Sequence, residues 1–328
     1  MQDADVVVIG AGVAGLTAAM IAAERGANTL VIEQSMPGGQ VATIERIRNF
    51  PGYPDGVAGY ELGPLLQQQA EAAGAAVRLD RVSALVPGDG AFRVVCGEDE
   101  VVARTVIMAA GSSLRQLGVA GEAEFVGRGV SHCAACDGPL FTGQAVAVVG
   151  GGDSAVDEAL VLAGHASELT LVHRGRSPSA RSPAIAQLAA LPHVSIVSDA
   201  DVVAIEGDRQ VRAIVIRRGE QIERTTCGAV FVYPGLEPRS ALLRDLVALD
   251  SDGHIETDLM MRTSLPGLFA AGDIRSRSVR LLASVAGDAA TAAISAIRYL
   301  QTDSDKNWDC WQGDDLGVGK RSRSASGR

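Results

Sequence analysis

The stretch Asp5-Val6-Val7-Val8-Ile9-Gly10-Ala11-Gly12-Val13-Ala14-Gly15 decides the fold of this chain. Its apolar half is typical of a strand buried on both faces of a parallel sheet. Its three glycines let the backbone turn tightly and approach a pyrophosphate at the start of the next helix, expected over 16–25. A second strand, 29–32, ends in Glu33, an acid placed to accept hydrogen bonds from ribose hydroxyls. Strand, helix, strand and acid together predict a dinucleotide-binding unit.

The same unit occurs a second time. An apolar strand over 145–149 leads into Gly150-Gly151-Gly152-Asp153-Ser154-Ala155, then a helix to residue 163 and a strand over 169–172. The spacing from first glycine to strand tip is identical, because 33 − 10 and 173 − 150 both equal 23. The tip is Glu33 in the first copy and His173-Arg174 in the second. An acid repels a 2′-phosphate and a base attracts one, so the first site suits FAD or NAD and the second NADPH.

These repeats predict an α/β fold with two Rossmann-like dinucleotide-binding domains, the second inserted into the first. Residues 1–113 and 242–301 are expected to form the first domain and residues 114–241 the second. The chain returns to the first domain through a buried strand at 268–271 that ends in Gly272-Asp273. A long helix over 281–300 follows, with Gly287 as its weak point.

The tail, 302–328, is rich in Asp, Ser, Gly and Arg and is expected to be flexible. Trp308, Cys310 and Trp311 are exceptions, which either pack on the body or supply an auxiliary thiol.

Between the two glycine motifs lies Ser131-His132-Cys133-Ala134-Ala135-Cys136-Asp137-Gly138-Pro139. Two thiols at this spacing close a disulfide, take part in thiol exchange, supply half of a zinc site, or are incidental. No second CxxC or CxxH completes four ligands, so no metal is expected, and the position between nucleotide motifs favours redox chemistry. His132 either lowers the pKa of Cys133 and carries its proton or is a partly exposed loop histidine, and its neighbours favour neither.

Composition excludes several classes of protein. The chain has 328 residues and a net charge of −10, from 39 acids and 29 bases, which gives no electrostatic support for nucleic-acid binding. No apolar run is long enough for a bilayer and the acidic start is unlike a signal peptide, so the cytoplasm is the default location. Five cysteines argue against a secreted disulfide scaffold, and Cys96 and Cys227 are expected to be small buried residues.

From residue 6 to residue 300 the chain resembles the bacterial low-molecular-weight thioredoxin reductase family. The resemblance rests on the order and spacing of six motifs: Gly10 to Gly15, Gly38-Gly39-Gln40, Asn49-Phe50-Pro51-Gly52, Cys133 to Gly138, Gly150 to Ala155, and Ala270-Ala271-Gly272-Asp273. The chain is too short for the separate dimerisation domain of glutathione-reductase-like enzymes, whose CxxxxC lies in the first domain.

The resemblance implies FAD in the first domain and NADPH in the second. The implied FAD site comprises Gly10, Gly12, Val13, Ala14, Gly15, Glu33, Gly39, Gln40, Asn49, Ala110, Gly111, Gly272, Asp273, Arg280, Leu281 and Leu282. The implied NADPH site comprises Gly150, Gly152, Asp153, Ser154, Ala155, His173, Arg174 and Arg181. Cys136 is the implied flavin-facing thiol, Cys133 the thiol that attacks the partner disulfide, and Asp137 the proton donor and acceptor. Relatives are homodimers that rotate one domain against the other and reduce thioredoxin or a similar protein.

Two departures from the family pattern concern the electron donor and the partner. The family's His-Arg-Arg motif, with a further arginine four positions on, reads here His173-Arg174-Gly175-Arg176, with Ser179 in place of the later arginine. Arg176 and Arg181 are the available replacements, although a phosphate contact depends on register. The family's Arg-Gln-Ala beside the flavin reads Arg280-Leu281-Leu282, which removes a polar side chain.

Two other functions remain open. The altered arginine motif favours a flavin-dependent dithiol oxidase that closes a disulfide in a small molecule and passes electrons to oxygen. The third possibility is a flavin-binding redox sensor whose dithiol state controls a partner without turnover.

Overall fold

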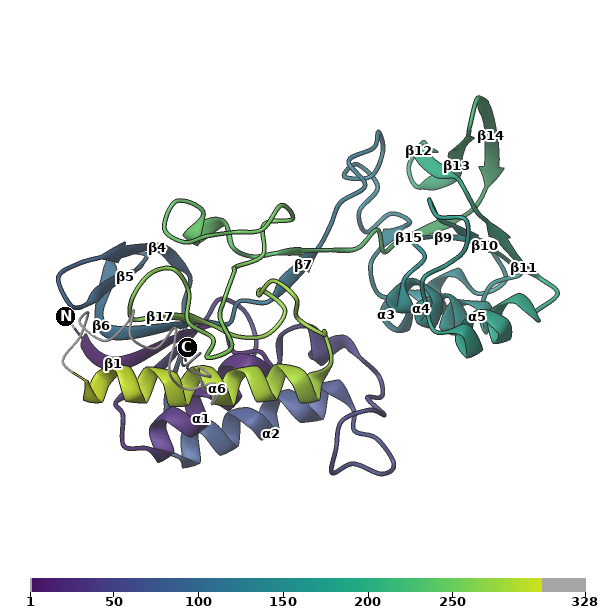
Figure 1. Cartoon of the computed structure of the whole chain (residues 1–328). Coiled ribbons are helices and arrows are strands. Elements are labelled where there is room, and N and C mark those ends of the chain that lie inside the picture. The colour runs from purple at the N-terminus through teal and green to yellow at the C-terminus, as the bar shows by residue number, and fades with distance from the viewer. Residues whose placement is uncertain (1, 303–328) are drawn as a thin grey trace, which may run out of the picture. The chain divides into compact units, whose positions relative to one another are not determined.

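The computed structural model describes residues 2–302 (Figure 1), so the tail residues Trp308, Cys310 and Trp311 lie outside the described part. The chain divides into two compact units. Unit 1 runs to Gly111 and resumes at Pro238, and unit 2 is the intervening segment Ser112–Glu237. The second unit is therefore inserted into the first.

Unit 1 is built on a seven-stranded sheet in the order β3-β2-β1-β6-β5-β4, with β17 paired to β6. Its strands are β1 (Gln2–Ile9), β2 (Thr29–Glu33), β3 (Ala76–Leu79), β4 (Val82–Pro87), β5 (Phe92–Cys96), β6 (Asp99–Met108) and β17 (Leu268–Ala270). The strands β3, β2, β1, β6 and β17 are parallel. The long strand β6 pairs β5 in antiparallel fashion through its first half and β17 in parallel through its second half.

Alternation along β1 sends successive side chains into two cores. Val6 and Val8 pack with the helices, whereas Val7 and Ile9 pack with residues of β4, β5 and the 243–274 region. The helices of unit 1 are α1 (Val13–Glu24), α2 (Gly59–Ala72) and α6 (Leu282–Gln301), with the short turns η1 (Gly39–Thr43) and η3 (Ala241–Leu243). All three α-helices lie on one side of this sheet (Figure 1). The sheet is thus covered by helices on one face and by loops and β-structure on the other.

Unit 2 contains a five-stranded parallel sheet in the order β11-β10-β9-β15-β8. Its strands are β8 (Val130–Ser131), β9 (Ala145–Val149), β10 (Glu168–Val172), β11 (Val194–Val197) and β15 (Ala229–Val232). An antiparallel sheet of β12 (Asp201–Gly207), β13 (Val211–Arg218) and β14 (Gln221–Thr226) accompanies it. The crossing segments β7 (Ser112–Leu114) and β16 (Leu236–Pro238) pair with each other.

The two faces of β9 again belong to different cores. Val146 and Val148 pack with the helices α3 (Ala134–Asp137), α4 (Asp153–Ala163) and α5 (Ser182–Ala189), and the turn η2 (Gly138–Phe141) follows α3. Ala147 and Val149 pack with side chains of the β12–β13–β14 sheet. The two units therefore repeat the same strand–helix–strand unit but cover its second face differently.

The prediction that Cys96 and Cys227 are small buried residues is confirmed, and both are free thiols. The helix α6 spans Gly287, the predicted weak point, without a break. Between residues 2 and 302, no helix combines the length and apolar content that crossing a bilayer requires.

Candidate active site and nucleotide cradles

The glycine loop of unit 1 packs at the carboxyl ends of the neighbouring strands β1, β6 and β17. Gly10 follows β1 with a φ of +104°, and a β-carbon there would stand 2.6 Å from the carbonyl oxygen of Ala109. Gly12 caps α1, with Val13, Ala14 and Gly15 in its buried first turn. A β-carbon on Gly272 would stand 3.0 Å from that of Ala14, which brings the loop after β17 against this turn. Side chains are thus excluded where a pyrophosphate would approach the helix.

The segment 38–40 packs against this glycine loop. The Gly38 amide donates to the Ala11 carbonyl at 2.8 Å, and a β-carbon on Gly39 would stand 3.2 Å from the Cα of Gly12. The Gln40 side chain comes within 3.8 Å of the position a β-carbon on Gly111 would take. The predicted residues Gly12, Gly39, Gln40 and Gly111 are thereby brought close together.

Glu33 has a role that the sequence did not reveal. It is buried at the end of β2, and its carboxylate accepts from the Ala11 amide at 2.7 Å and from the Ser35 amide at 2.9 Å. The acid thus fixes the glycine loop as well as standing at the strand tip predicted for ribose recognition. Spacing alone cannot separate these two roles, because both need an acid at the same position.

Ala110 follows β6 and lies against Gly10. The other predicted residues of unit 1 lie in the loops before α2 and α6 or at the start of α6. Asn49 is exposed in the loop after η1. Burial raises the pKa of Asp273, whose Oδ1 accepts from the Ser278 hydroxyl at 3.1 Å. Arg280 has a φ of +57° and extends its Nη2 to 3.3 Å from His254 Nε2. Leu281 caps α6 and is 48% exposed, and Leu282 begins the helix.

The second glycine motif lies at the end of β9 in unit 2. Gly150 has a φ of +139°, and a β-carbon there would stand 2.2 Å from the Tyr233 carbonyl oxygen. Gly152 caps α4, whose first turn contains the exposed Asp153 and Ser154 and the buried Ala155.

The three basic residues predicted to hold a 2′-phosphate have different surroundings. His173 is buried, its Nε2 lies 2.9 Å from the Ser198 hydroxyl, and burial lowers the pKa of its ring. Arg174 is exposed. Arg181 donates through Nη2 to both carboxylate oxygens of Asp157, at 2.7 and 2.8 Å, and through Nε to Asp153 at 3.2 Å. Two carboxylates on α4 therefore neutralise Arg181, an effect that sequence spacing could not reveal.

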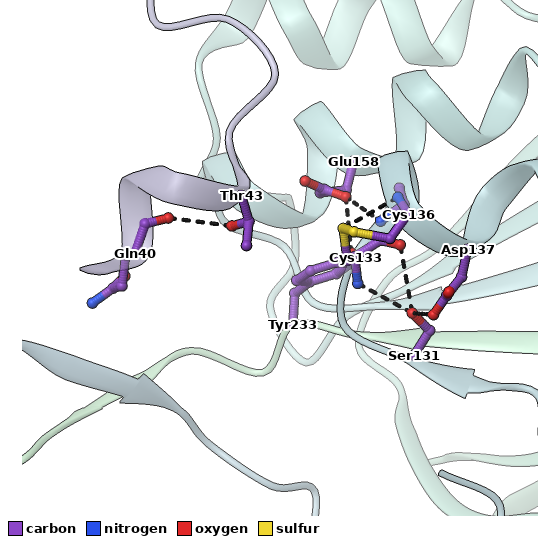
Figure 2. Close-up of a disulfide and its surroundings, with 9 residues drawn as sticks. Gln40, Thr43, Ser131, Cys133, Cys136, Asp137, Glu158 and Tyr233 are labelled. Atoms are coloured by element: carbon purple, nitrogen blue, oxygen red, sulfur yellow. Dashed lines mark hydrogen bonds between the residues drawn. A yellow bond between two sulfur atoms is a disulfide. The ribbon is translucent and has the colours of Figure 1, made fainter. Parts of the chain in front are cut away.

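Cys133 and Cys136 form a disulfide with a Cα–Cα distance of 5.3 Å. Figure 2 shows the pair at the start of the short helix α3, where the Cys136 amide donates to Cys133 Sγ at 3.2 Å. Cys133 is half-buried and Cys136 is exposed. An accessible disulfide at the start of a helix is suited to thiol exchange.

Asp137 is held beside the disulfide through a serine. The Ser131 hydroxyl donates to Asp137 Oδ2 at 2.6 Å and accepts from the Cys133 amide at 3.1 Å (Figure 2). This arrangement gives a carboxyl group that can exchange a proton close to the reactive sulfurs. His132 points elsewhere, because its Nδ1 lies 3.0 Å from the Val232 carbonyl oxygen.

Two residues of this site were missed at the sequence level. Glu158, on α4, accepts at Oε2 from the Ala134 amide at 2.6 Å and from the Tyr233 hydroxyl at 3.0 Å (Figure 2). Nothing in the sequence links these three positions, because they are brought together only when α3, α4 and the end of β15 pack.

Fold and site define a flavin-dependent disulfide oxidoreductase with two nucleotide-binding units and a CxxC in the second. The chain belongs to the pyridine nucleotide-disulphide oxidoreductase family, whose model matches residues 4–293. This confirms the family expected from the motifs.

Within that family the chain is similar to thioredoxin reductases. It is 39% identical to the thioredoxin reductase of Treponema pallidum over 303 residues, covering 92% of this chain and 98% of the relative. It is 40% identical to the bifunctional thioredoxin reductase/thioredoxin of Mycobacterium leprae, covering 90% of this chain and 66% of the relative. The solved thioredoxin reductase of Lactococcus lactis matches with a TM-score of 0.87 and 34% identity, covering 91% of this chain and 99% of that one.

Proposed function

We propose that this protein is a thioredoxin reductase that passes electrons from NADPH through FAD to the Cys133–Cys136 disulfide and on to a protein disulfide, such as that of thioredoxin. The observation that carries the proposal is the CxxC disulfide with Asp137 held beside it, on the unit that also carries the second glycine motif. Relatives named thioredoxin reductase, including one fused to thioredoxin, support the choice of partner. We also propose that the protein is a cytoplasmic homodimer.

The glycine loop of unit 1 is proposed to hold FAD. Gly10, Gly12 and Gly15 would face its pyrophosphate, Glu33 its ribose, and Gln40 and Asp273 the flavin end. When bound, this group supplies two-electron transfer between nicotinamide and disulfide. The chain's own contribution is to exclude side chains from the cradle and to fix the loop through the Glu33–Ala11 hydrogen bond.

We propose that side chains of the protein supply and remove protons at the disulfide. Reduction converts the disulfide into two thiols by adding two electrons and two protons. We propose that Asp137 donates and accepts one of these protons, with Ser131 holding its Oδ2 in place. Cys136 is proposed as the sulfur that would face the flavin when it is bound, and Cys133 as the thiol that attacks the partner disulfide.

NADPH is proposed to bind at the second glycine motif, with Gly150, Gly152 and Ala155 at the pyrophosphate. Arg174 and Arg176 are exposed in the loop after β10 and are proposed for the 2′-phosphate, with Arg174 first because it directly follows the strand tip, since Arg181 is engaged by Asp153 and Asp157. His173 is buried and is proposed to support the loop.

One anaerobic titration tests the proposal. The flavin-loaded protein is titrated with NADPH and then with NADH while flavin absorbance and free thiols are followed. We expect stoichiometric NADPH to reduce the flavin and then the disulfide. A flavin and disulfide that both stay oxidised would reject the proposal. Cys136→Ser should abolish reduction of thioredoxin while FAD stays bound, and normal turnover by this variant would contradict the assigned roles.

The pairing of Arg181 with Asp157 favours one second candidate, because it weakens the phosphate site. In that case the flow runs in reverse. A small dithiol is oxidised to a disulfide, its two electrons and two protons pass to oxygen, and hydrogen peroxide forms. Oxygen uptake with a small dithiol and no nicotinamide, at a rate above that of thioredoxin reduction, would select this function.

A further inference from the structure

A single carboxylate joins the redox-active segment to the helix of the second glycine motif. Glu158 lies in the second turn of α4, and its Oε2 accepts from the Ala134 amide at 2.6 Å and from the Tyr233 hydroxyl at 3.0 Å. Ala134 directly follows Cys133. Figure 2 shows Glu158 and Tyr233 on the same side of the disulfide segment, with Ser131 and Asp137 on the other.

Burial and a backbone hydrogen bond hold Tyr233 in place beside the Glu158 carboxylate. Its side chain is buried, and its amide donates to the Val149 carbonyl at 2.7 Å. Its own carbonyl oxygen fills the space beside Gly150. Burial and the charge of Glu158 raise the pKa of Tyr233, so the phenol keeps its proton and donates it. A buried tyrosine whose hydroxyl donates to one carboxylate oxygen holds that carboxylate in one orientation.

Two successive amides of the redox segment are therefore directed to two different acids. The Cys133 amide donates to the Ser131 hydroxyl, which donates to Asp137, and the Ala134 amide donates directly to Glu158. The proposed proton transfer uses Asp137 and assigns no role to Glu158. A negative charge held beside a thiol disfavours the thiolate, because two like charges then lie close together in a partly dry environment.

We propose that Glu158, oriented by Tyr233, is a positioning residue that keeps the Cys133 thiol protonated after the disulfide is reduced. This inference rests on the proposed function, in which the dithiol must wait for its partner. Retaining the proton limits attack on unintended disulfides and oxidants, because the thiolate is the nucleophile. Removal of that proton is left to Asp137. Other titratable groups near the segment include His132, within it, and His165, whose ring lies against Gly138. Neither is changed in the test below.

The test measures the thiol–disulfide equilibrium of the flavin-loaded full chain in Glu158→Gln. Glutamine keeps an oxygen that can accept from Ala134 and Tyr233 but removes the charge. Protein is equilibrated anaerobically with mixtures of reduced and oxidised dithiothreitol at pH 7 and at pH 9. Thiols are then alkylated, and the peptide that contains Cys133 and Cys136 is quantified. Each equilibrium constant is divided by that of the unsubstituted protein, which cancels the ionisation of dithiothreitol.

At pH 9 we expect Glu158→Gln to shift the equilibrium about tenfold toward the dithiol, about 30 mV for a two-electron couple. At pH 7 the shift should fall below about threefold, because the charge acts only on the ionised thiol. Tyr233→Phe should shift the pH 9 equilibrium a few-fold in the same direction, because the carboxylate loses the hydroxyl that holds it beside the redox segment. A merely structural role predicts shifts that are equal at both pH values, and such a result, or none at pH 9, would overturn the proposal.

Glu220→Gln is the matched control, since it removes a carboxylate from the exposed turn between β13 and β14 of the same unit. It should leave both equilibria unchanged, and a shift as large as that of Glu158→Gln would overturn the proposal. Neither nicotinamide nor thioredoxin enters the experiment. The two proposals can therefore fail separately. The protein could fail to accept electrons from NADPH and still show the pH-dependent shift, or it could accept electrons from NADPH and show no such shift.

Discussion

A β-carbon added to Gly15 would stand 1.7 Å from the carbonyl oxygen of Gly10. The first turn of α1 therefore lies directly against the end of β1, and only hydrogen fits between them. The second copy of the unit has Ala155 at the corresponding place, and a β-carbon added to Gly150 would stand 3.0 Å from its methyl group. The first cradle is thus closed more tightly than the second.

We predict that Gly15→Ala forces α1 away from β1, destabilises unit 1 by about 1–3 kcal/mol and abolishes retention of FAD. Flavin absorbance after gel filtration and urea unfolding measure the two effects. Gly287→Ala is the control, because it also adds one methyl group to a helical glycine but meets nothing within 4 Å. That change should keep FAD and stabilise the protein by about 0.5–1 kcal/mol. Equal flavin content in both variants would contradict the proposed steric role of Gly15.

The second prediction concerns proton transfer at the disulfide. Asp137→Asn removes the acid and should lower thioredoxin reduction by about 10²-fold or more, while the flavin is still reduced by NADPH. Ser131→Ala keeps the acid but removes the hydroxyl that holds it at 2.6 Å, and should cost less, about tenfold. Stopped-flow absorbance separates flavin reduction from disulfide turnover. Wild-type turnover in Asp137→Asn would remove Asp137 from the mechanism.

The third prediction concerns nucleotide choice. Asp157→Asn releases one of the two carboxylate partners of Arg181, so the KM for NADPH should fall a few-fold while that for NADH stays constant. The effect is small because exposed ion pairs are worth about 0–1 kcal/mol. Arg174→Ala should raise the KM for NADPH about tenfold and spare NADH. If Arg174→Ala changes both nucleotides equally, Arg174 does not read the 2′-phosphate.

The fourth prediction follows from the buried thiols. Burial raises the pKa of Cys227 to about 12 and also raises that of Cys96. At pH 8 only about one Cys227 in 10⁴ is ionised, so iodoacetamide should leave both thiols unmodified in the native protein. On reduction, Cys133 and Cys136 should be alkylated first. Labelling of Cys227 should increase as the pH approaches 12 or once the chain unfolds, and peptide mass spectrometry follows each site.

The raised pKa of Cys227 also predicts how the free energy of unfolding changes with pH. An unfolded thiol loses its proton near pH 9, whereas the folded one keeps it until about pH 12. The stabilising contribution is therefore complete below pH 9 and is lost as the pH rises through that window. Cys227→Ala should reduce the fall in the free energy of unfolding between pH 9 and pH 11. An unchanged slope would mean that the thiol titrates alike in the folded and the unfolded chain.

Sequence pattern alone determined the two nucleotide-binding units and the position of the CxxC. The apolar strands, the glycines that follow them and the 23-residue spacing are local features of the chain. Together they specify the backbone of a strand–helix–strand unit. Tertiary structure decided which charges face one another. Arg181 looked like a phosphate ligand, but packing of its loop against α4 places it between Asp153 and Asp157. Glu158 and Tyr233 are 75 positions apart, and only the sheet brings them to Ala134. The physical reason is that hydrophobic periodicity is read along the chain, whereas the partner of a charge is set by elements distant in sequence.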